Sequence, residues 1–287
     1  MDWFNKGKNI LIVGLGLMGG SYARALKRLR YHVAAIDRDP EAIAYALQEH
    51  IISEGSADDD ERLIREADAI IFALYPGIFP EWVEKHRHLF RGGTMITDVT
   101  GVKSCIVYKI QEILPEDVEF IAAHPMAGRE LSGVKHSDER IFRDANYIVV
   151  PTEKNTPKGV EWCGMLGRML GCARIAVLSP EEHDEMIAFV SQLTHCIAVS
   201  LMTCSDSTHL ADYTGDSFRD LTRIARINDK MWSELFMLNR EPLLKQMDTF
   251  LAEMTRFREM LAAGDTEGMR AKMRLSTERR ALFDKQP

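Results

Sequence analysis

A glycine-rich turn near the start of the chain sets the strongest limit on its fold. Residues 14–19 read GLGLMG, so three glycines are spaced GxGxxG. The apolar run NILIV leads into the turn, and the helical pattern SYARALKRL follows it. A strand, a tight turn and a helix in this order are typical of the first unit of a parallel, doubly wound α/β sheet. The sequence therefore predicts such a sheet at this end of the chain.

Short β-branched runs alternate with helical patterns through the first half of the chain. The predicted helices include residues 21–30 and 41–50. The predicted strands are residues 9–13, 32–36, 69–73, 94–97, 119–122 and 147–150, with a possible edge strand at 174–178. We expect a Rossmann-type domain over residues 1–178.

The pattern changes at Ser179. Ser179 can cap a helix, Pro180 suits its first turn, and Glu182 can complete a capping box. Strand signals are almost absent beyond this point, which predicts an all-helical second domain over residues 179–287. Its apolar positions recur at heptad-like steps, which fits either an intrachain core or a seam between two subunits of a homodimer. These positions are Leu243, Met247, Phe250, Met254, Phe257 and Leu261.

Composition excludes several classes of function. The 287 residues include 36 Lys and Arg against 43 Asp and Glu, a net charge of -7, which argues against nucleic-acid binding but leaves small anionic substrates open. The five cysteines form no CxxC pair, so neither a disulfide framework nor a metal site is expected. No signal segment precedes the first strand and no apolar run reaches about 18 residues. We therefore expect a cytoplasmic protein with no membrane partner.

The glycine turn also predicts a dinucleotide site. Gly14 permits the tight turn, Gly16 lets a pyrophosphate approach the backbone, and Gly19 lets the helix pack close to the sheet. The free N–H groups of the helix N-terminus, around Leu17 and Met18, then face the phosphates.

The second predicted strand ends in Asp37, where a carboxylate can accept hydrogen bonds from the adenosine ribose and repel a 2′-phosphate. This favours NAD as the cofactor. The neighbouring Arg38 can stack on adenine or attract that phosphate, so NADP is not excluded.

Three further stretches are unusually specific together: DVTGVKS from Asp98, HPMAGRELSG from His124, and TRIA from Thr222 with the nearby Met231–Trp232 pair. With GLGLMGGS, they resemble the prephenate/arogenate dehydrogenase family over nearly the whole chain. The resemblance implies a Rossmann domain, a helical dimerisation domain and an active site between them. It also implies NAD-dependent oxidative decarboxylation of prephenate to 4-hydroxyphenylpyruvate in tyrosine biosynthesis, with arogenate as the alternative substrate.

His124 suits this chemistry because it follows a predicted strand end, and an imidazole can take the proton of an alcohol while hydride leaves. By resemblance it is the catalytic histidine, and His195 is a second histidine near the substrate. The resemblance assigns Arg223 to a substrate carboxylate, Asp220 to the same polar network, and Glu130 to the pocket mouth.

Other positions carry open alternatives. Asp98 either lies beside the nicotinamide or caps the following helix, and Lys103 either orients polar groups there or is exposed. Many relatives have serine at the position of Gly101, where its hydroxyl is expected to bond the catalytic histidine; Thr100 is the candidate replacement. Arg129 adds a positive charge that slightly favours prephenate.

Two other functions remain open from the sequence. A 3-hydroxyacid dehydrogenase or imine reductase shares the layout, but its hydroxyacid members need a lysine on the interdomain helix, and residues 181–204 contain none. A non-catalytic, NAD-responsive dimer is the third interpretation.

Overall fold

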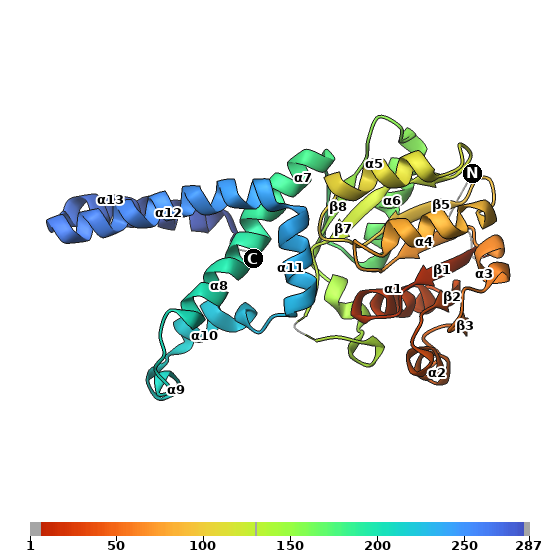
Figure 1. The fold of residues 1–287 in the computed structure, drawn as a ribbon, viewed down its shortest axis with the longest axis horizontal. Coiled ribbons are helices and arrows are strands. Elements are labelled where there is room, and N and C mark those ends of the chain that lie inside the picture. Colours follow the sequence, from red (N-terminus) through yellow and green to blue (C-terminus); the bar gives the residue numbers. More distant parts are fainter. Residues whose placement is uncertain (1–6, 130, 284–287) are drawn as a thin grey trace. The chain divides into compact units, whose positions relative to one another are not determined.

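The structure is a computed structural model that describes residues 7–129 and 131–283 (Figure 1). The chain forms two compact units, Met1–Asn239 and Arg240–Pro287. The first unit holds every strand of the described chain, and both units are rich in helix.

The first unit contains a six-stranded, wholly parallel sheet with the strand order β3-β2-β1-β4-β5-β6. The predicted parallel, doubly wound fold is confirmed. The strands are β1 (Asn9–Val13), β2 (His32–Ile36), β3 (Glu54–Ser56), β4 (Ala69–Phe72), β5 (Met95–Asp98) and β6 (Glu119–Phe120). The sequence missed β3 because its residues, EGS, carry no apolar or β-branched signal.

A second, three-stranded sheet follows in the order β7-β8-β9. Its strands are β7 (Ala122–Pro125), β8 (Asn146–Val150) and β9 (Arg174–Val177), with β7 antiparallel to β8. The single strand predicted at residues 119–122 is therefore wrong: the chain changes sheets near Ile121, whose N–H still bonds the carbonyl of Ile96 in β5. The predicted edge strand at 174–178 is confirmed as β9.

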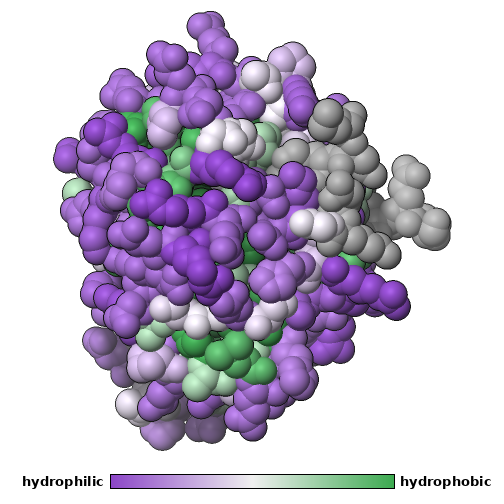
Figure 2. Space-filling view, turned by 90° about the vertical axis from the view of Figure 1, so that its right-hand side faces the viewer, coloured by the Kyte–Doolittle hydropathy of each residue, from purple (hydrophilic) through white to green (hydrophobic). Residues whose placement is uncertain are grey.

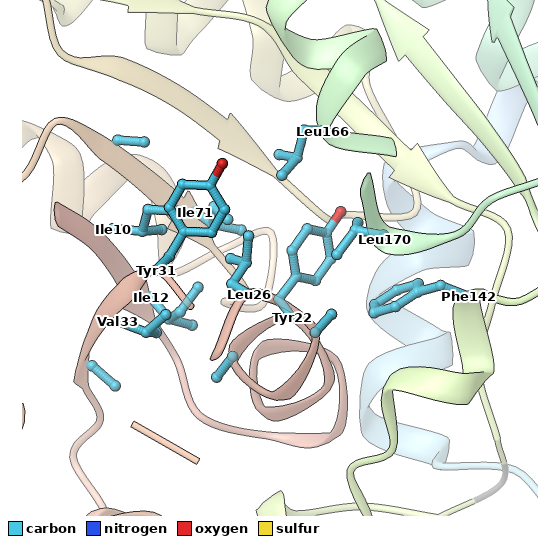
Figure 3. Close-up of a cluster of buried hydrophobic side chains, with 14 of the residues drawn as sticks. Ile10, Ile12, Tyr22, Leu26, Tyr31, Val33, Ile71, Phe142, Leu166 and Leu170 are labelled. Carbon is cyan, nitrogen blue, oxygen red and sulfur yellow. The ribbon is translucent and has the colours of Figure 1, made fainter. Parts of the chain in front are cut away.

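Alternate residues of the parallel strands face two separate cores. Ile10 and Ile12 of β1 belong to a cluster that includes Tyr22 and Leu26 of helix α1 (Leu17–Arg28; Figure 3). Leu11 of the same strand belongs to a second cluster on the opposite face. Because both faces are covered, the strands read as continuous apolar runs. The face in Figure 2 is accordingly mainly hydrophilic, with small apolar patches.

The helices of the first unit are α1 (Leu17–Arg28), α2 (Pro40–Gln48), α3 (Glu61–Glu66), α4 (Phe79–His86), α5 (Ser104–Ile113), α6 (Pro157–Leu170), α7 (Pro180–Ile187), α8 (Thr194–Thr203), α9 (Leu210–Tyr213), α10 (Asp216–Thr222) and α11 (Asp229–Leu238). Helices α1, α2 and α6 pack on the sheet side of the first cluster, and α3, α4 and α5 supply most of the helical residues of the second. Short 3₁₀ turns lie at Arg87–Leu89, Val134–His136, Glu139–Phe142, Arg223–Ala225 and Ala281–Phe283.

The predicted helix start at Ser179 is confirmed. The Ser179 hydroxyl accepts the N–H of Glu182, and the Glu182 side chain accepts the N–H of Ser179, which completes the capping box of α7. A π-helical turn, η4 (Ala188–Leu193), joins α7 to α8. Within the described residues, Pro180–Thr203 is the one helical stretch whose length and composition would allow it to cross a membrane, which is weak evidence for a span.

The second unit consists mainly of α12 (Arg240–Ala263) and α13 (Thr266–Arg280), which pack against each other. Lys272 of α13 forms an ion pair with Glu253 of α12. Two apolar positions of the α12 stripe stay exposed, Met254 at 54% and Leu261 at 64%. A purely intrachain core would not leave them open to solvent.

Candidate active site

The glycine turn has the geometry that a dinucleotide site requires. Gly14 has a φ of 94°, and a side chain there would meet the Ala73 carbonyl. A Cβ at Gly19 would clash with the Gly14 carbonyl, so glycine lets α1 approach the turn. By contrast, a Cβ at Gly16 would meet nothing within 4 Å. Gly16 therefore faces open space at the N-terminus of α1, where no side chain caps the free N–H groups.

Leu17 and Met18 begin α1, and Asp37 follows the last residue of β2. The Asp37 carboxylate accepts the N–H of Leu15 in the glycine turn and, at 2.8 Å, the N–H of Asp39. These bonds fix the carboxylate beside the turn, as a ribose-binding residue requires. Arg38 is exposed.

A buried ion pair lies at the carboxyl end of β5. Lys103 and Asp98 are both 0% exposed, and the Lys103 Nζ lies 2.7 Å from Oδ2 of Asp98. The exposed alternative for Lys103 is therefore wrong. Lys103 also donates to the carbonyl of Ala123 at 2.6 Å, and Asp98 accepts the N–H of the same residue at 3.1 Å. The pair thus binds both the N–H and the carbonyl of Ala123, the residue before His124. Neither side chain of the pair is exposed to a ligand.

Thr100 belongs to the same buried cluster. Its hydroxyl contacts Asp98 Oδ2 and the carbonyl of Val102, and it receives a bond from Lys103 at 3.2 Å. The hydroxyl is committed to these partners and not to the His124 ring, so the structure does not support the expectation that Thr100 replaces a serine at position 101. Asp98 does not cap α5 either. The N–H groups of Lys103 and Ser104 at that helix start are bound by Asp184 of α7, at 2.9 and 2.8 Å.

His124 lies on β7, half-buried, and its ring contacts a histidine that the sequence interpretation overlooked. Nδ1 of His124 lies 2.9 Å from Nε2 of His183, and Nδ1 of His183 lies 2.8 Å from Oδ1 of Asp184. His183 and Asp184 lie next to the predicted capping box, but nothing local in the sequence indicates that they reach His124. The one hint is that His183 and Asp184 are polar residues on the face of α7 that is buried.

Burial, together with the neighbouring His183 and Lys103, keeps the His124 ring neutral. Burial, then His183, then Lys103 hold the pKa of His124 well below its ordinary value of 6.5. Burial also lowers the pKa of His183. Although burial alone would raise the pKa of Asp184, hydrogen bonds from His183 and the Ser104 N–H lower it below 3.8. Near neutral pH the site therefore holds an ionised Asp184 and two neutral imidazoles.

His195 lies on α8, with its ring stacked on Trp232 of α11 at a centroid distance of 3.7 Å. Its Nδ1 bonds the carbonyl of Ser191 at 2.9 Å, a group in the π-helical turn. Gln192 of the same turn bonds Asn239 at 2.7 Å and the carbonyl of Leu235 at 3.2 Å, which fastens the turn to the end of α11.

The remaining predicted residues are more exposed. Asp220 is on α10, and Arg223 begins the 3₁₀ turn Arg223–Ala225, which packs against α8. Arg129 is paired with Asp138 at 3.1 Å, so part of its charge is already neutralised. Glu130 lies outside the described residues. Among the described residues, no group of His, Cys, Asp and Glu side chains could hold a metal ion.

Comparison with known proteins decides the family. Residues 22–171 match the nucleotide-binding domain of prephenate dehydrogenase, and residues 179–275 match its dimerization domain. The chain belongs to the prephenate dehydrogenase family. The predicted family, an NAD-dependent oxidoreductase that decarboxylates its substrate, is confirmed, and the matched dimerization domain supports a homodimer.

Three family relatives illustrate the similarity. The prephenate dehydrogenase of Bacillus subtilis is 31% identical over 91% of this chain and 72% of its own length. The cyclohexadienyl dehydrogenase of Zymomonas mobilis is 27% identical over 94% of this chain and 97% of its own. The structure of Aquifex aeolicus prephenate dehydrogenase with hydroxyphenyl propionate and NAD⁺ is 28% identical, covers 98% of this chain and 100% of its own, and has a TM-score of 0.88.

Two glycine substitutions test the cofactor site of this family member. Gly16→Ala places a methyl group in open space, so we expect normal folding but NAD binding weakened roughly tenfold or more, because the phosphates lose their approach. Gly19→Ala drives a methyl group into the Gly14 carbonyl and should also lower the thermal stability. Calorimetric NAD titration and melting curves separate the two effects. Wild-type NAD affinity in Gly16→Ala would contradict the assignment.

A histidine titration followed by NMR tests the charge state of His124. Because burial, His183 and Lys103 all disfavour the imidazolium, the ring should remain neutral as the pH falls through 6.5 and take up its proton only at lower pH. An inflection of the His124 Cε1–H resonance at or above 6.5 would show that this account of the site is wrong.

Proposed function

We propose that this chain oxidises prephenate with NAD, that His124 accepts the proton of the ring hydroxyl, and that the substrate loses carbon dioxide. The observation that carries this proposal is the neutral imidazole of His124, tied through Nδ1 and half-buried at the end of a strand. A general base must be unprotonated at the working pH, and it must be held within reach of the hydroxyl.

The reaction balances with this single proton acceptor. The ring hydroxyl gives its proton to Nε2 of His124. NAD, which the glycine turn and Asp37 would hold, would supply the acceptor for the hydride of the carbon that bears this hydroxyl. The bond to the ring carboxylate then breaks, its electron pair enters the ring, and carbon dioxide leaves. The new carbonyl oxygen becomes a phenol when the His124 imidazolium returns the proton. The residues of the chain need only orient the substrate and move one proton, because aromatisation favours the second step.

The substrate side of the proposal is assigned to the helical segments. Arg223 suits a carboxylate because a guanidinium offers a rigid pair of donors. The packing of its 3₁₀ turn against α8, which carries His195, supports a shared site. Asp220 completes the polar surroundings in this proposal. The rings of His195 on α8 and Trp232 on α11 supply an aromatic surface.

Arogenate is the alternative substrate. It differs from prephenate by an ammonium group in place of a keto group, so few contacts decide the choice. The Arg129–Asp138 ion pair weakens the argument that Arg129 favours the keto acid. One relative is named a cyclohexadienyl dehydrogenase, so arogenate stays as the alternative substrate in this proposal.

We also propose a cytoplasmic homodimer that binds neither nucleic acid nor membrane. The exposed apolar positions of α12 and of the Pro180–Thr203 stretch, such as Phe189 at 55%, support a surface that a second subunit covers. Contact with a partner subunit would account for the apolar, incompletely buried stretch Pro180–Thr203, so that no membrane is needed to explain it.

Initial rates with prephenate and arogenate, each with NAD and NADP, test the reaction and its specificity. We expect prephenate with NAD to be preferred, because the Asp37 carboxylate beside the glycine turn would accept hydrogen bonds from the adenosine ribose and repel a 2′-phosphate. Preference for arogenate would replace the substrate assignment, and absence of turnover in all four reactions would remove the proposed activity.

Two substitutions separate proton transfer from substrate binding. His124→Asn should lower kcat by about 100-fold or more while NAD affinity stays near that of the wild type, because the base contacts the hydroxyl. Arg223→Ala should chiefly raise KM. The lost binding free energy should be about 2–5 kcal/mol if the pair between Arg223 and the substrate carboxylate is desolvated. Steady-state kinetics with calorimetric NAD binding distinguish the two. Near-normal turnover in His124→Asn would contradict its role, as would an unchanged KM in Arg223→Ala.

A further inference from the structure

Three side chains from two distant segments form one hydrogen-bonded line. Asp184 and His183 are on α7, His124 is on β7, and the two contacts between them measure 2.8 and 2.9 Å. His183 is 0% exposed and Asp184 is 3% exposed, so water does not compete for these bonds. Since the line ends on the proposed base, its proton arrangement decides which nitrogen of His124 is free.

Asp184 fixes the proton arrangement at one end of the line. Its two carboxylate oxygens are held by the N–H groups of Lys103 and Ser104, at the positive end of the α5 dipole. An ionised carboxylate only accepts hydrogen bonds, so the proton of neutral His183 must lie on Nδ1. Nε2 of His183 is then an acceptor, and Nδ1 of His124 must be the donor. Nε2 of His124 consequently keeps its lone pair.

The alternative anchors for the His124 ring are absent or already engaged. Position 101 is glycine, and a Cβ there would be 4.0 Å from Cε1 of His124, so the residue lies beside the ring without a group to bind it. The Thr100 hydroxyl is held by Asp98 and Val102. In the described chain, the hydrogen-bond partner of the His124 ring is Nε2 of His183, which accepts from Nδ1 of His124.

We propose that His183, oriented by Asp184, is the positioning residue that sets the tautomer and the ring orientation of His124. This inference rests on the proposed role of His124 as the base. His183 touches neither the reacting atoms nor the cofactor in this scheme. It holds the Nδ1 proton of His124 so that Nε2 can accept the substrate proton, and it supplies the anchoring that Gly101 lacks.

The first test compares His183→Leu with His183→Gln, and uses His86→Leu as the matched control. Leucine removes both hydrogen bonds, whereas a glutamine amide can accept from His124 and donate to Asp184. His86 is also a buried histidine, but it bonds Trp82 and Asp59 instead. We expect His183→Leu to lower kcat by about 100-fold, the lower end of what a positioned base contributes, with little change in NAD affinity. His183→Gln should recover a large part of that loss, and His86→Leu should keep the wild-type kcat.

The second test reads the tautomer directly and needs no turnover. In the wild type, ¹⁵N NMR should show a protonated Nδ1 and an unprotonated Nε2 on His124. His183→Leu should shift the ring toward the Nε2–H tautomer, while His183→Gln should retain the wild-type pattern. An unchanged tautomer in His183→Leu would overturn the proposal. An equal loss of kcat in His86→Leu would also overturn it, as would a kcat loss that only tracks the melting temperatures of the variants. If the wild type turns over neither prephenate nor arogenate, the proposed function fails while the tautomer measurement still decides the role of His183.

Discussion

The buried ion pair between Lys103 and Asp98 is the interaction on which the geometry of the candidate site depends. Removing two charges from water is costly, and a pair in the interior persists only when its remaining hydrogen bonds are satisfied. Here they are satisfied by Thr100 and by both peptide groups of Ala123. The pair therefore joins the end of β5 to β7 at the residue that precedes His124. Apolar replacements would fill the same volume, but they would leave those peptide groups without partners.

The same pair sets the electrostatics of the site. Burial is the main reason that the pKa of both imidazoles is low, and the positive charge of Lys103 adds to it by disfavouring a second positive charge nearby. Asp184 balances this charge at the start of α5, where the helix dipole also stabilises an anion. The site thus has a defined protonation pattern in which His183, Asp184, Lys103 and Asp98 are buried and His124 is half-buried. A base that must accept a proton near neutral pH benefits from such an arrangement.

Within the first unit, separate sets of hydrogen bonds hold the glycine turn and the helical segments that carry the site. The N–H of Leu15 in the glycine turn donates to the Asp37 carboxylate, and the N–H of Gly14 donates to the carbonyl of Ile36 at the end of β2. The π-helical turn between α7 and α8 is fastened to α11 through Gln192 and Asn239. Glu234 of α11 in turn binds the N–H of Gly77, in the loop after β4, at 2.6 Å. The loops at the ends of the parallel strands and the helical segments therefore support each other.

The sequence by itself determined the features that depend on near neighbours along the chain. The bounds of β1 and β2, the glycine turn and the capping box at Ser179 follow from apolar runs, backbone freedom and side-chain hydrogen bonds within a few residues. Only the tertiary structure decided the addition of β3, the division of residues 119–122 between two sheets, the burial of Lys103 and the contact of His183 with His124. These features depend on which groups packing brings together across distant segments, and local periodicity contains no information about such partners.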